Sequence, residues 1–462
     1  MPSPRPWRRA AFAIALLGAV APGVRAQQPT GPEDAGRAPR DSMRANWRVA
    51  LPAIRIQHLR PRDQRGINVF EPPKRDSVRY RGFALQLGAA FTQQFQGVSH
   101  ENDADSVRTS AVNATNANRL IGIGNGFPNA VANLYIDAQV ARGIRVAMTS
   151  YLSARHHQET WVKDGYFQID DSPFEVELLD RLMEHLTVRI GHFEINYGDA
   201  HFRRADNGQA LYNPLVGNYI LDAFTTEIGG DVYWRQGPVL LMGGLTGGEI
   251  RGQVTVPERR SFAHIFKVGL DRQVSRDLRV RLTGSTYGTG QSNSNTLYTG
   301  DRAGSQYFLV LENSQATETA QAWSGQVRPG FTNMVHAYVV NPFVKFHGLE
   351  LFGNIETATG RATGEASKRS VRQQVAEGVF RFAQRDQLYA AARWNRVAGR
   401  LAANIPDDSR VERWQAGGGW FITPLVLLKG EWVDQRYDDF PRTDIRSGAA
   451  FRGFMVAGNV AF

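Results

Sequence analysis

The sequence predicts an all-β protein: a 16-stranded antiparallel transmembrane β-barrel with short periplasmic turns, long outer loops and an inward-folded third loop. Three observations predict this fold: the alternation of the last residues, a regular succession of strands and turns, and charges that fall on one face of those strands. A barrel suits a membrane because its last strand pairs with its first, so that no strand edge is left without hydrogen bonds.

The last ten residues, 453–462, alternate between two faces. A strand sends successive side chains to opposite sides, so that every second residue shares a face. One face carries Phe454, Val456, Gly458, Val460 and Phe462, and the other carries Met455, Ala457, Asn459 and Ala461. A soluble domain rarely ends on such a strand, because an unpaired apolar edge promotes aggregation. We therefore expect residues 453–462 to be the sixteenth strand and to close the barrel against residues 81–95.

Residues 1–26 have the features of a secretory signal peptide. Arg5, Arg8 and Arg9 precede an apolar run over residues 10–20, and small residues then supply a cleavage site. The apolar run is too short to cross a bilayer as a helix. Because no longer apolar run follows, the mature chain is not expected to span a membrane with helices.

The remaining chain divides into two regions. Residues 27–80 are basic and rich in proline, and we expect a periplasmic extension there. This extension is either a flexible linker or a segment that folds into the barrel mouth, and both interpretations stay open. Residues 81–462 form the predicted barrel domain.

Short and long connections alternate along the barrel domain, as they do in outer-membrane barrels. Seven short turns are expected, near residues 142–143, 181–185, 236–238, 275–277, 347–348, 384–387 and 423–424. Eight long polar loops are expected, near residues 97–130, 157–164, 198–224, 249–260, 290–330, 360–370, 399–411 and 438–446.

The composition argues against several functional classes. The chain has no cysteine, so it forms no disulfide, thiolate metal site or cysteine nucleophile. The net charge of +10 suggests nucleic acid at first, but the excess of bases lies in residues 1–80. Bases and acids nearly balance in residues 81–462, so that we expect no nucleic-acid partner. We expect no cofactor and no metal.

The sequence also argues against an enzyme. It contains neither a G-x-S-x-G nor an H-E-x-x-H motif. His156 and His157 are adjacent, and neighbouring side chains on a strand point to opposite faces, so they do not readily share one metal or substrate. Two alternatives to a channel stay open: a barrel enzyme, and a structural barrel that binds a partner through residues 27–80.

Charged residues on the strands are expected to face the inside, because an arginine that faces lipid at mid-bilayer costs about 2–4 kcal/mol. Alternation along residues 278–282 turns Arg279 and Arg281 inward. The same alternation turns inward the cations Arg145, Arg189, Lys267, Arg381, Arg393 and Lys429, and the acids Asp137, Glu175, Glu177, Glu227, Asp231, Glu350, Glu356 and Glu431. We expect a water-filled channel, and the alternative is a plugged barrel with a salt-bridged interior.

The third loop, residues 198–224, is long yet rich in large apolar side chains. Such a loop is expected to pack inward against the barrel wall and to narrow the pore. His201, Arg203 and Arg204 are then candidate anion contacts, because guanidinium groups bind phosphate or carboxylate through paired hydrogen bonds. The alternative is that the two arginines pair with aspartates of the same loop, Asp199 and Asp206.

Residues 81–462 resemble the phosphate-selective porin O and P family of outer-membrane proteins. The resemblance is strongest at residues 134–151, 186–193 and 224–234. It implies a 16-stranded, commonly trimeric barrel whose third loop constricts the pore. Phe462 resembles the signal by which the outer-membrane insertion machinery recognises its clients.

These arguments together predict a porin in the bacterial outer membrane that lets ions and small hydrophilic solutes diffuse, with a phosphate-like anion preference as the finer expectation. The expected partners are outer-membrane lipid and lipopolysaccharide, the insertion machinery, further copies in a homotrimer, and small anionic or neutral solutes. The candidate pore-lining residues are Arg145, Arg189, His201, Arg203, Arg204, Lys267, Arg279, Arg281, Arg381 and Arg393.

Overall fold

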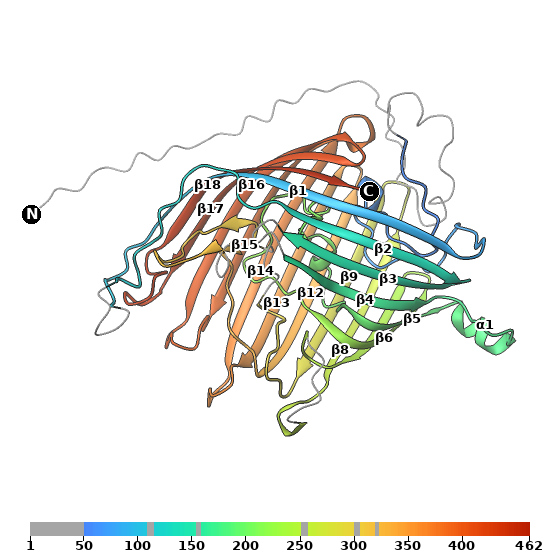
Figure 1. Cartoon of the computed structure of the whole chain (residues 1–462), viewed down its shortest axis with the longest axis horizontal. Helices are drawn as coiled ribbons and strands as arrows, with labels where there is room; N and C mark the ends of the chain where they lie inside the picture. The colour runs from blue at the N-terminus through green and yellow to red at the C-terminus, as the bar shows by residue number, and fades with distance from the viewer. Residues whose placement is uncertain (1–49, 109–114, 154–158, 251–256, 300–304, 319–322) are drawn as a thin grey trace, which may run out of the picture.

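The computed structural model describes residues 50–108, 115–153, 159–250, 257–299, 305–318 and 323–462. Within these ranges, sixteen strands form one closed antiparallel barrel (Figure 1). The predicted number of strands and the closure of the barrel are thereby confirmed. The expected signal peptide, and residues 27–49 of the extension, lie outside the described residues.

Neighbouring barrel strands follow one another along the chain. The barrel strands are β1 (Ala84–Glu101), β2 (Val131–Ala141), β3 (Ile144–Ser153), β4 (Glu159–Ile169), β5 (Leu186–Glu194), β6 (Thr226–Gln236), β7 (Val239–Thr246), β8 (Ala263–Gln273), β9 (Leu278–Thr289), β12 (Met334–Phe346), β13 (Leu349–Arg361), β14 (Arg369–Phe382), β15 (Leu388–Gly399), β16 (Ser409–Thr423), β17 (Val426–Asp438) and β18 (Ala450–Ala461). A separate two-stranded sheet, β10 (Tyr307–Phe308) and β11 (Trp323–Ser324), lies in the connection from β9 to β12. The helices that lie wholly within the described ranges are α1 (Glu177–Met183) and four short 3-10 turns, η1 (Gln64–Gly66), η2 (Ala200–Phe202), η3 (Pro257–Arg259) and η4 (Gln384–Asp386).

The first and last strands close the barrel. Strand β1 pairs with β18 from Ala90–Ala461 onward, and the two strands lie side by side in Figure 1. Phe454 and Val460 on β18 are 46% and 38% exposed, whereas Ala457 on the opposite face is fully buried. The last strand therefore has the two faces that its alternation predicts, and it pairs with the predicted partner.

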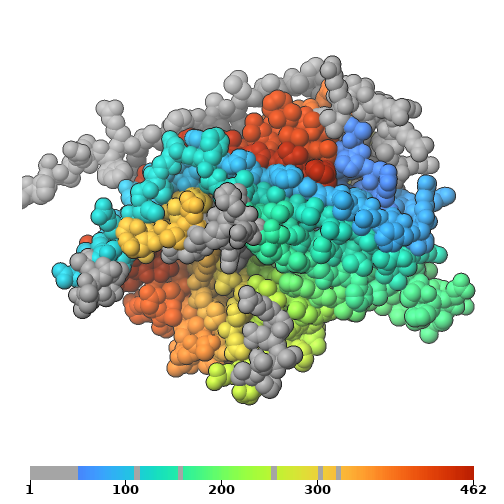
Figure 2. Space-filling view, in the orientation of Figure 1, coloured from blue at the N-terminus to red at the C-terminus, as the bar shows by residue number. Residues whose placement is uncertain are grey.

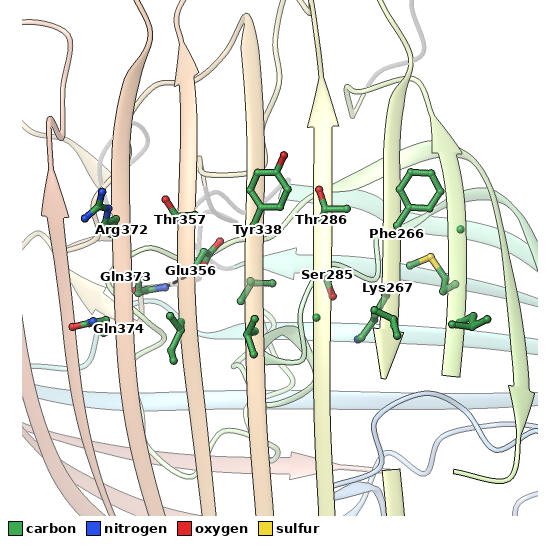
Figure 3. Close-up of a pocket in the computed structure, with 18 of the residues that line it drawn as sticks. Phe266, Lys267, Ser285, Thr286, Tyr338, Glu356, Thr357, Arg372, Gln373 and Gln374 are labelled. Carbon is green, nitrogen blue, oxygen red and sulfur yellow. Dashed lines mark hydrogen bonds between the residues drawn. The ribbon is translucent and has the colours of Figure 1, made fainter. Parts of the chain in front are cut away.

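The outer face of the barrel is apolar. On β9, Val280 and Leu282 are exposed while Arg281 between them is buried. Figure 3 shows part of this wall, where Phe266 and Tyr338 line a largely apolar groove that extends from β6 to β14 along the barrel. Such alternation is what a wall between lipid and a polar interior requires.

The two ends of the barrel differ, and we call them the turn end and the loop end. Most connections at the turn end are short; Gly143, for example, adopts a positive φ of +64° in the turn between β2 and β3. The connections at the loop end are longer, and they include the third loop, residues 195–225, and the fifth loop, residues 290–333. None of the helices in the described ranges is long and apolar enough to cross a membrane.

One connection at the turn end is longer than predicted. Residues 170–185 join β4 to β5 and contain α1, which projects from the edge of the barrel in Figures 1 and 2. Glu175 and Glu177 lie in this projection and are exposed, so the prediction that they face the lumen is wrong. The reason is local: Glu177 bonds Arg181 one helical turn later, at 2.5 Å, so this stretch follows the period of a helix and not that of a strand.

Strand β4 also begins earlier than predicted. The polar stretch expected as a loop at residues 157–164 belongs to β4 from Glu159 onward. A β-bulge lies at this point: Thr149 pairs with Asp164 and Ser150 pairs with Val162, so that Lys163 is the extra residue. A bulge breaks the alternation of side chains, and Lys163 and Asp164 are both buried inside the barrel.

Candidate functional site

The inside of the barrel is a polar surface that other parts of the same chain cover. Inward-facing Asp137, Asn395 and Arg413 have no exposed surface. Polar barrel interiors are either filled with water or filled by protein segments, and burial of this degree means that the described lumen is filled. The filling consists of the third loop, the fifth loop and a stretch of the extension, residues 56–74, which we call the plug segment.

The third loop crosses the lumen, and its first half is held by the wall of β1, β2 and β18. The N–H of Gly208 donates to Asn133 Oδ1 at 2.9 Å, and Thr92 and Asn459 both donate to the Gly208 carbonyl at 2.8 Å. A Cβ atom at Gly208 would lie 2.5 Å from the Cα of Ala132. Glycine therefore lets the backbone of the loop lie directly against the backbone of the wall.

The second half of the third loop is held by β17, the strand next to β18. Lys429 on β17 donates to the carbonyls of Ala210, Asn213 and Leu215 at 2.7, 2.9 and 2.7 Å. The lysine is 2% exposed. Its ammonium group therefore satisfies three loop carbonyls that would otherwise be buried without a donor.

Two further wall residues bind the backbone of this loop. Gln373 on β14 accepts from the N–H of Leu221 at 2.9 Å and donates to its carbonyl at 2.7 Å. Glu431 on β17 accepts from the N–H groups of Val216 and Gly217 at 2.7 and 3.1 Å. The loop is thus fixed by side chains of the wall that replace the backbone partners it would have in a sheet. The predicted inward fold of the third loop is confirmed.

The fifth loop fills the space beside the third loop. Tyr307 in β10 is fully buried and donates to Glu431 Oε1 at 2.6 Å. The N–H of the next residue, Phe308, donates to Gln96 of β1 at 2.8 Å. This part of the fifth loop therefore lies against β17 and β1, the two neighbours of β18.

The plug segment closes the turn end. Its Phe70 is 2% exposed. The N–H of Gln64 donates to the carbonyl of Pro424, in the turn between β16 and β17, at 3.0 Å. Arg62 pairs with Asp137 on β2 at 2.6 Å. Of the two alternatives for the extension, a flexible linker or a segment that folds into the barrel mouth, its described part therefore matches the second.

Glu71 of the plug segment contacts two cations of the wall at once. Its carboxylate lies 2.9 Å from Arg281 and 3.1 Å from Lys267. The same two cations bind Asp199 of the third loop, at 2.8 and 2.7 Å. Burial favours the protonated acid, but the two cations outweigh it and hold the pKa of Glu71 well below its usual range. The pKa of Asp199 is lowered by the same competition, to about 2.

The plug segment also packs against the third loop. Phe70 contacts Phe202 edge to face, with ring centroids 5.9 Å apart. Arg60 donates to the carbonyl of Phe202 at 3.0 Å, and Tyr212 donates to the carbonyl of Pro61. The two segments therefore support each other across the lumen.

The structure places the ten candidate pore-lining residues inside the barrel and gives each an acidic partner. The pairs are Arg145–Asp137, Arg189–Asp231, His201–Glu194, Arg203–Glu377, Arg204–Asp222, Lys267–Asp199, Arg279–Asp271, Arg281–Asp199, Arg381–Glu350 and Arg393–Glu377. Nine of these contacts are ion pairs, and the tenth is a hydrogen bond between the ring of His201 and Glu194.

The arginines of the third loop differ from the expected free anion contacts. Arg203 bonds Glu377 at 2.8 Å and also Asn68 of the plug segment. Arg204 binds the carboxylate of Asp222 with two nitrogens, at 3.1 and 2.7 Å. Both guanidinium groups are occupied by protein ligands, because buried cations need fixed partners.

The alternative pairing within the loop is half correct. Arg204 reaches Asp206 at 3.2 Å, as that alternative requires. Asp199 is bound by Lys267 and Arg281 of the wall instead of Arg203.

The sequence argument missed the residues that bind loop backbone and plug, such as Gln373, Asn68 and Glu71. They are polar residues on inward positions or in a proline-rich stretch, and their partners lie far away in the chain. The sequence offers one indication of such residues: an amide side chain at an inward position of a strand, because an amide is unfavourable on a face that contacts lipid. Across the described ranges, no group of three or more histidine and acidic side chains is arranged to hold a metal ion.

No protein-family model matches this chain, and no curated protein matches it. Among solved structures, the outer membrane protein OmpT of Vibrio cholerae in its trimer form is 9% identical, with 82% of this chain and 100% of that chain covered and a TM-score of 0.49. An anion-selective porin from Comamonas acidovorans is 9% identical over the same shares, with a TM-score of 0.48. OprB of Pseudomonas putida is 10% identical over 82% of this chain and 94% of that chain, with a TM-score of 0.46. Because each of these three TM-scores lies below 0.5, these likenesses leave the activity of this chain undecided.

Proposed function

We propose that the protein is an outer-membrane channel of the porin type, for passive diffusion of ions and small hydrophilic solutes, held closed here by the plug segment and the inward loops. The observation that carries the proposal is a closed 16-stranded barrel with an apolar outer face and a charged inner face. A closed barrel satisfies every backbone group within a bilayer. A channel uses charges on its inner wall to attract or repel ions. In a purely structural barrel, removing those charges from water would cost free energy without a functional return.

The site of action follows from the same proposal. Residues 1–26 act as a signal peptide, and Phe462 as the recognition residue for the insertion machinery. The apolar outer face meets outer-membrane lipid and lipopolysaccharide, and three copies assemble as a homotrimer. The proposal contains no catalytic step.

An anion preference of the phosphate-selective type is the finer part of the proposal. It is supported by the cations at the turn end that face the plug segment, since Lys267 and Arg281 both bind Glu71. When the plug leaves, these two cations and Arg279 remain beside Asp271 of the wall and Asp199 of the third loop. One positive charge then has no acidic partner in this cluster, and it favours anions near the opened mouth.

A structural barrel is the second candidate function. The observation that favours it is the filled lumen, in which Arg413, Asn395 and Asn459 have no exposed surface. In that case the third loop, the fifth loop and the plug segment form a permanent core, and the extension serves as an attachment to a partner.

Planar-bilayer recordings separate these two functions. The full-length protein and a variant without residues 27–80 are compared in the same lipid. A gated channel gives small or rare conductance steps with the full-length protein and larger, more frequent steps without the extension. If the correctly folded variant and the full-length protein both fail to conduct, the channel is wrong and the structural barrel is preferred. Reversal potentials of the opened variant in chloride and phosphate gradients test the anion preference.

A further inference from the structure

Two histidines converge on the outer face of the barrel, away from the lumen. His264 on β8 pairs in register with Gly288 on β9, and Gly288 pairs with His336 on β12. The two imidazoles therefore stand on either side of a residue without a side chain. Their ring centroids are 6.3 Å apart and the ring planes are inclined by 42°.

The glycine is what allows the rings to approach. A Cβ atom at Gly288 would lie 2.7 Å from Nε2 of His264 and 2.7 Å from Nδ1 of His336. One nitrogen from each ring therefore faces the same small space. Among the described residues, neither imidazole has a hydrogen bond or an ion pair, so that both nitrogens are available to a ligand.

The pair is accessible from outside the barrel. His264 lies two residues from Phe266, and His336 two residues from Tyr338, toward the loop end. Figure 3 shows Phe266 and Tyr338 on the outer face, with Thr286 of β9 between them. Both histidines are partly exposed at this level. The pair thus sits near the rim where strands meet the loops, above the apolar groove.

We propose that His264 and His336 form a binding site for a divalent transition-metal ion. Neutral imidazole nitrogen is a preferred ligand for Zn²⁺, Cu²⁺ and Ni²⁺. The shared point is 2.7 Å from each nitrogen, and a metal–nitrogen bond is about 2.0–2.1 Å, so small rotations of the two rings bring both nitrogens to bonding distance. The protein supplies two ligands, and water or an added ligand takes the remaining positions.

The surroundings set the metal preference and the strength. Lys368 lies close enough to His336 to act on its charge, and a nearby cation disfavours a bound cation. With two neutral ligands and no carboxylate ligand shown among the described residues, the site binds modestly. The general order of divalent metal affinities then makes Cu²⁺ the tightest of the three ions. A bound ion joins β8 to β12 across β9.

Copper titration of the full-length protein in detergent tests the proposal. His156 and His157 lie outside the described residues, so both are first changed to alanine in every sample to lower background binding. In that background, we expect one bound Cu²⁺. Its electron paramagnetic resonance spectrum should show superhyperfine splitting from two imidazole nitrogens. His264→Gln and His336→Gln each remove one nitrogen from the spectrum and weaken binding.

Gly288→Ala is the most specific variant, because it keeps both histidines and fills the space between them with a methyl group. We expect it to lose the two-nitrogen spectrum. His347→Gln is the matched control: this histidine is 51% exposed, lies at the turn end, and its loss leaves the spectrum unchanged. The shift in gel mobility on heating verifies that each variant is folded. The proposal is overturned if the folded background protein shows no two-nitrogen copper signal, or if the signal survives in the double His264→Gln, His336→Gln variant.

Discussion

At the scale of single residues, the inside of this barrel holds buried ion pairs, such as Arg203–Glu377, beside buried charges that bind neutral groups, such as Lys429. Arg203 is 4% exposed and joins the third loop to Glu377 of the wall. Such a pair gains little over a well-packed apolar contact, but removing one partner is costly because it leaves the other charge buried. The arginines of the lumen therefore act first as structural residues, whatever they contribute to selectivity after opening.

Arg203→Met tests this structural role. Glu377 keeps Arg393 as a partner, so the expected loss of unfolding free energy is at the lower end for a broken buried pair, about 3 kcal/mol. Urea unfolding in detergent measures it. The matched control is Arg442→Met, whose side chain is 70% exposed and pairs with Asp105. The control is expected to cost less than about 1 kcal/mol. Equal losses in both variants would contradict a structural role for Arg203.

Alternation along the strands predicted most of the wall at the scale of elements, and it failed where the backbone departs from a regular strand. The bulge at Lys163 conceals the start of β4, and Glu175 and Glu177, which alternation turns inward, lie in the projection that contains α1. The apolar content of the third loop predicted that it folds inward. Its anchors were not predictable, because Lys429 binds Ala210 across more than two hundred residues and only the closed barrel brings them together.

Lys429→Met is expected to release the third loop while the wall stays intact. The methionine fills a similar volume but leaves three loop carbonyls without their donor, at a cost of about 1–3 kcal/mol for each buried group that stays unsatisfied. Limited proteolysis is expected to cut the third loop faster in this variant. Lys368→Met, at an exposed position between β13 and β14, serves as the control. Unchanged cleavage in Lys429→Met would show that the other anchors suffice.

The plug segment is expected to stay in place under moderate acid. The pKa of Glu71 is lowered in the folded state, so its ion pairs stabilise the plug above the ordinary glutamate pKa of 4.5 and lose that effect as the pH falls through the lower folded value. Protease access to residues 56–74 is therefore expected to be the same at pH 7 and pH 5 and to rise only in stronger acid.

Glu71→Gln replaces the carboxylate by an uncharged amide, so that the ion pairs with Arg281 and Lys267 are lost at every pH. We expect the variant to expose the plug segment and to raise conductance at pH 7. Glu184→Gln, at the exposed end of α1, is the control, because it removes the same single negative charge. Release of the wild-type plug between pH 7 and pH 5 would mean that another group holds it.

At the scale of the whole molecule, the fold depends on pairing the two ends of the barrel domain. Strands β1 and β18 are separated by most of the chain, yet they pair from Ala90–Ala461 to Glu101–Ala450. Non-local pairing of this kind forms late, because it closes a very long loop. Until it forms, β1 and β18 each have a free apolar edge, which is unstable both in water and in lipid.

Removal of residues 450–462 is therefore expected to abolish folding and not merely to weaken it. Without β18, the edges of β1 and β17 keep unpaired N–H and C=O groups that a bilayer cannot satisfy. The matched deletion replaces α1, residues 177–183, by a short Gly-Ser linker; it removes a structured element that projects outside the wall and leaves all sixteen strands. Refolding into detergent, followed by the shift in gel mobility on heating, distinguishes the two variants. The α1 deletion is expected to refold, and the β18 deletion is expected to aggregate. A heat-sensitive, protease-resistant species from the β18 deletion would mean that fifteen strands close on themselves, and closure by the terminal strand would then not be the step that commits this chain to its fold.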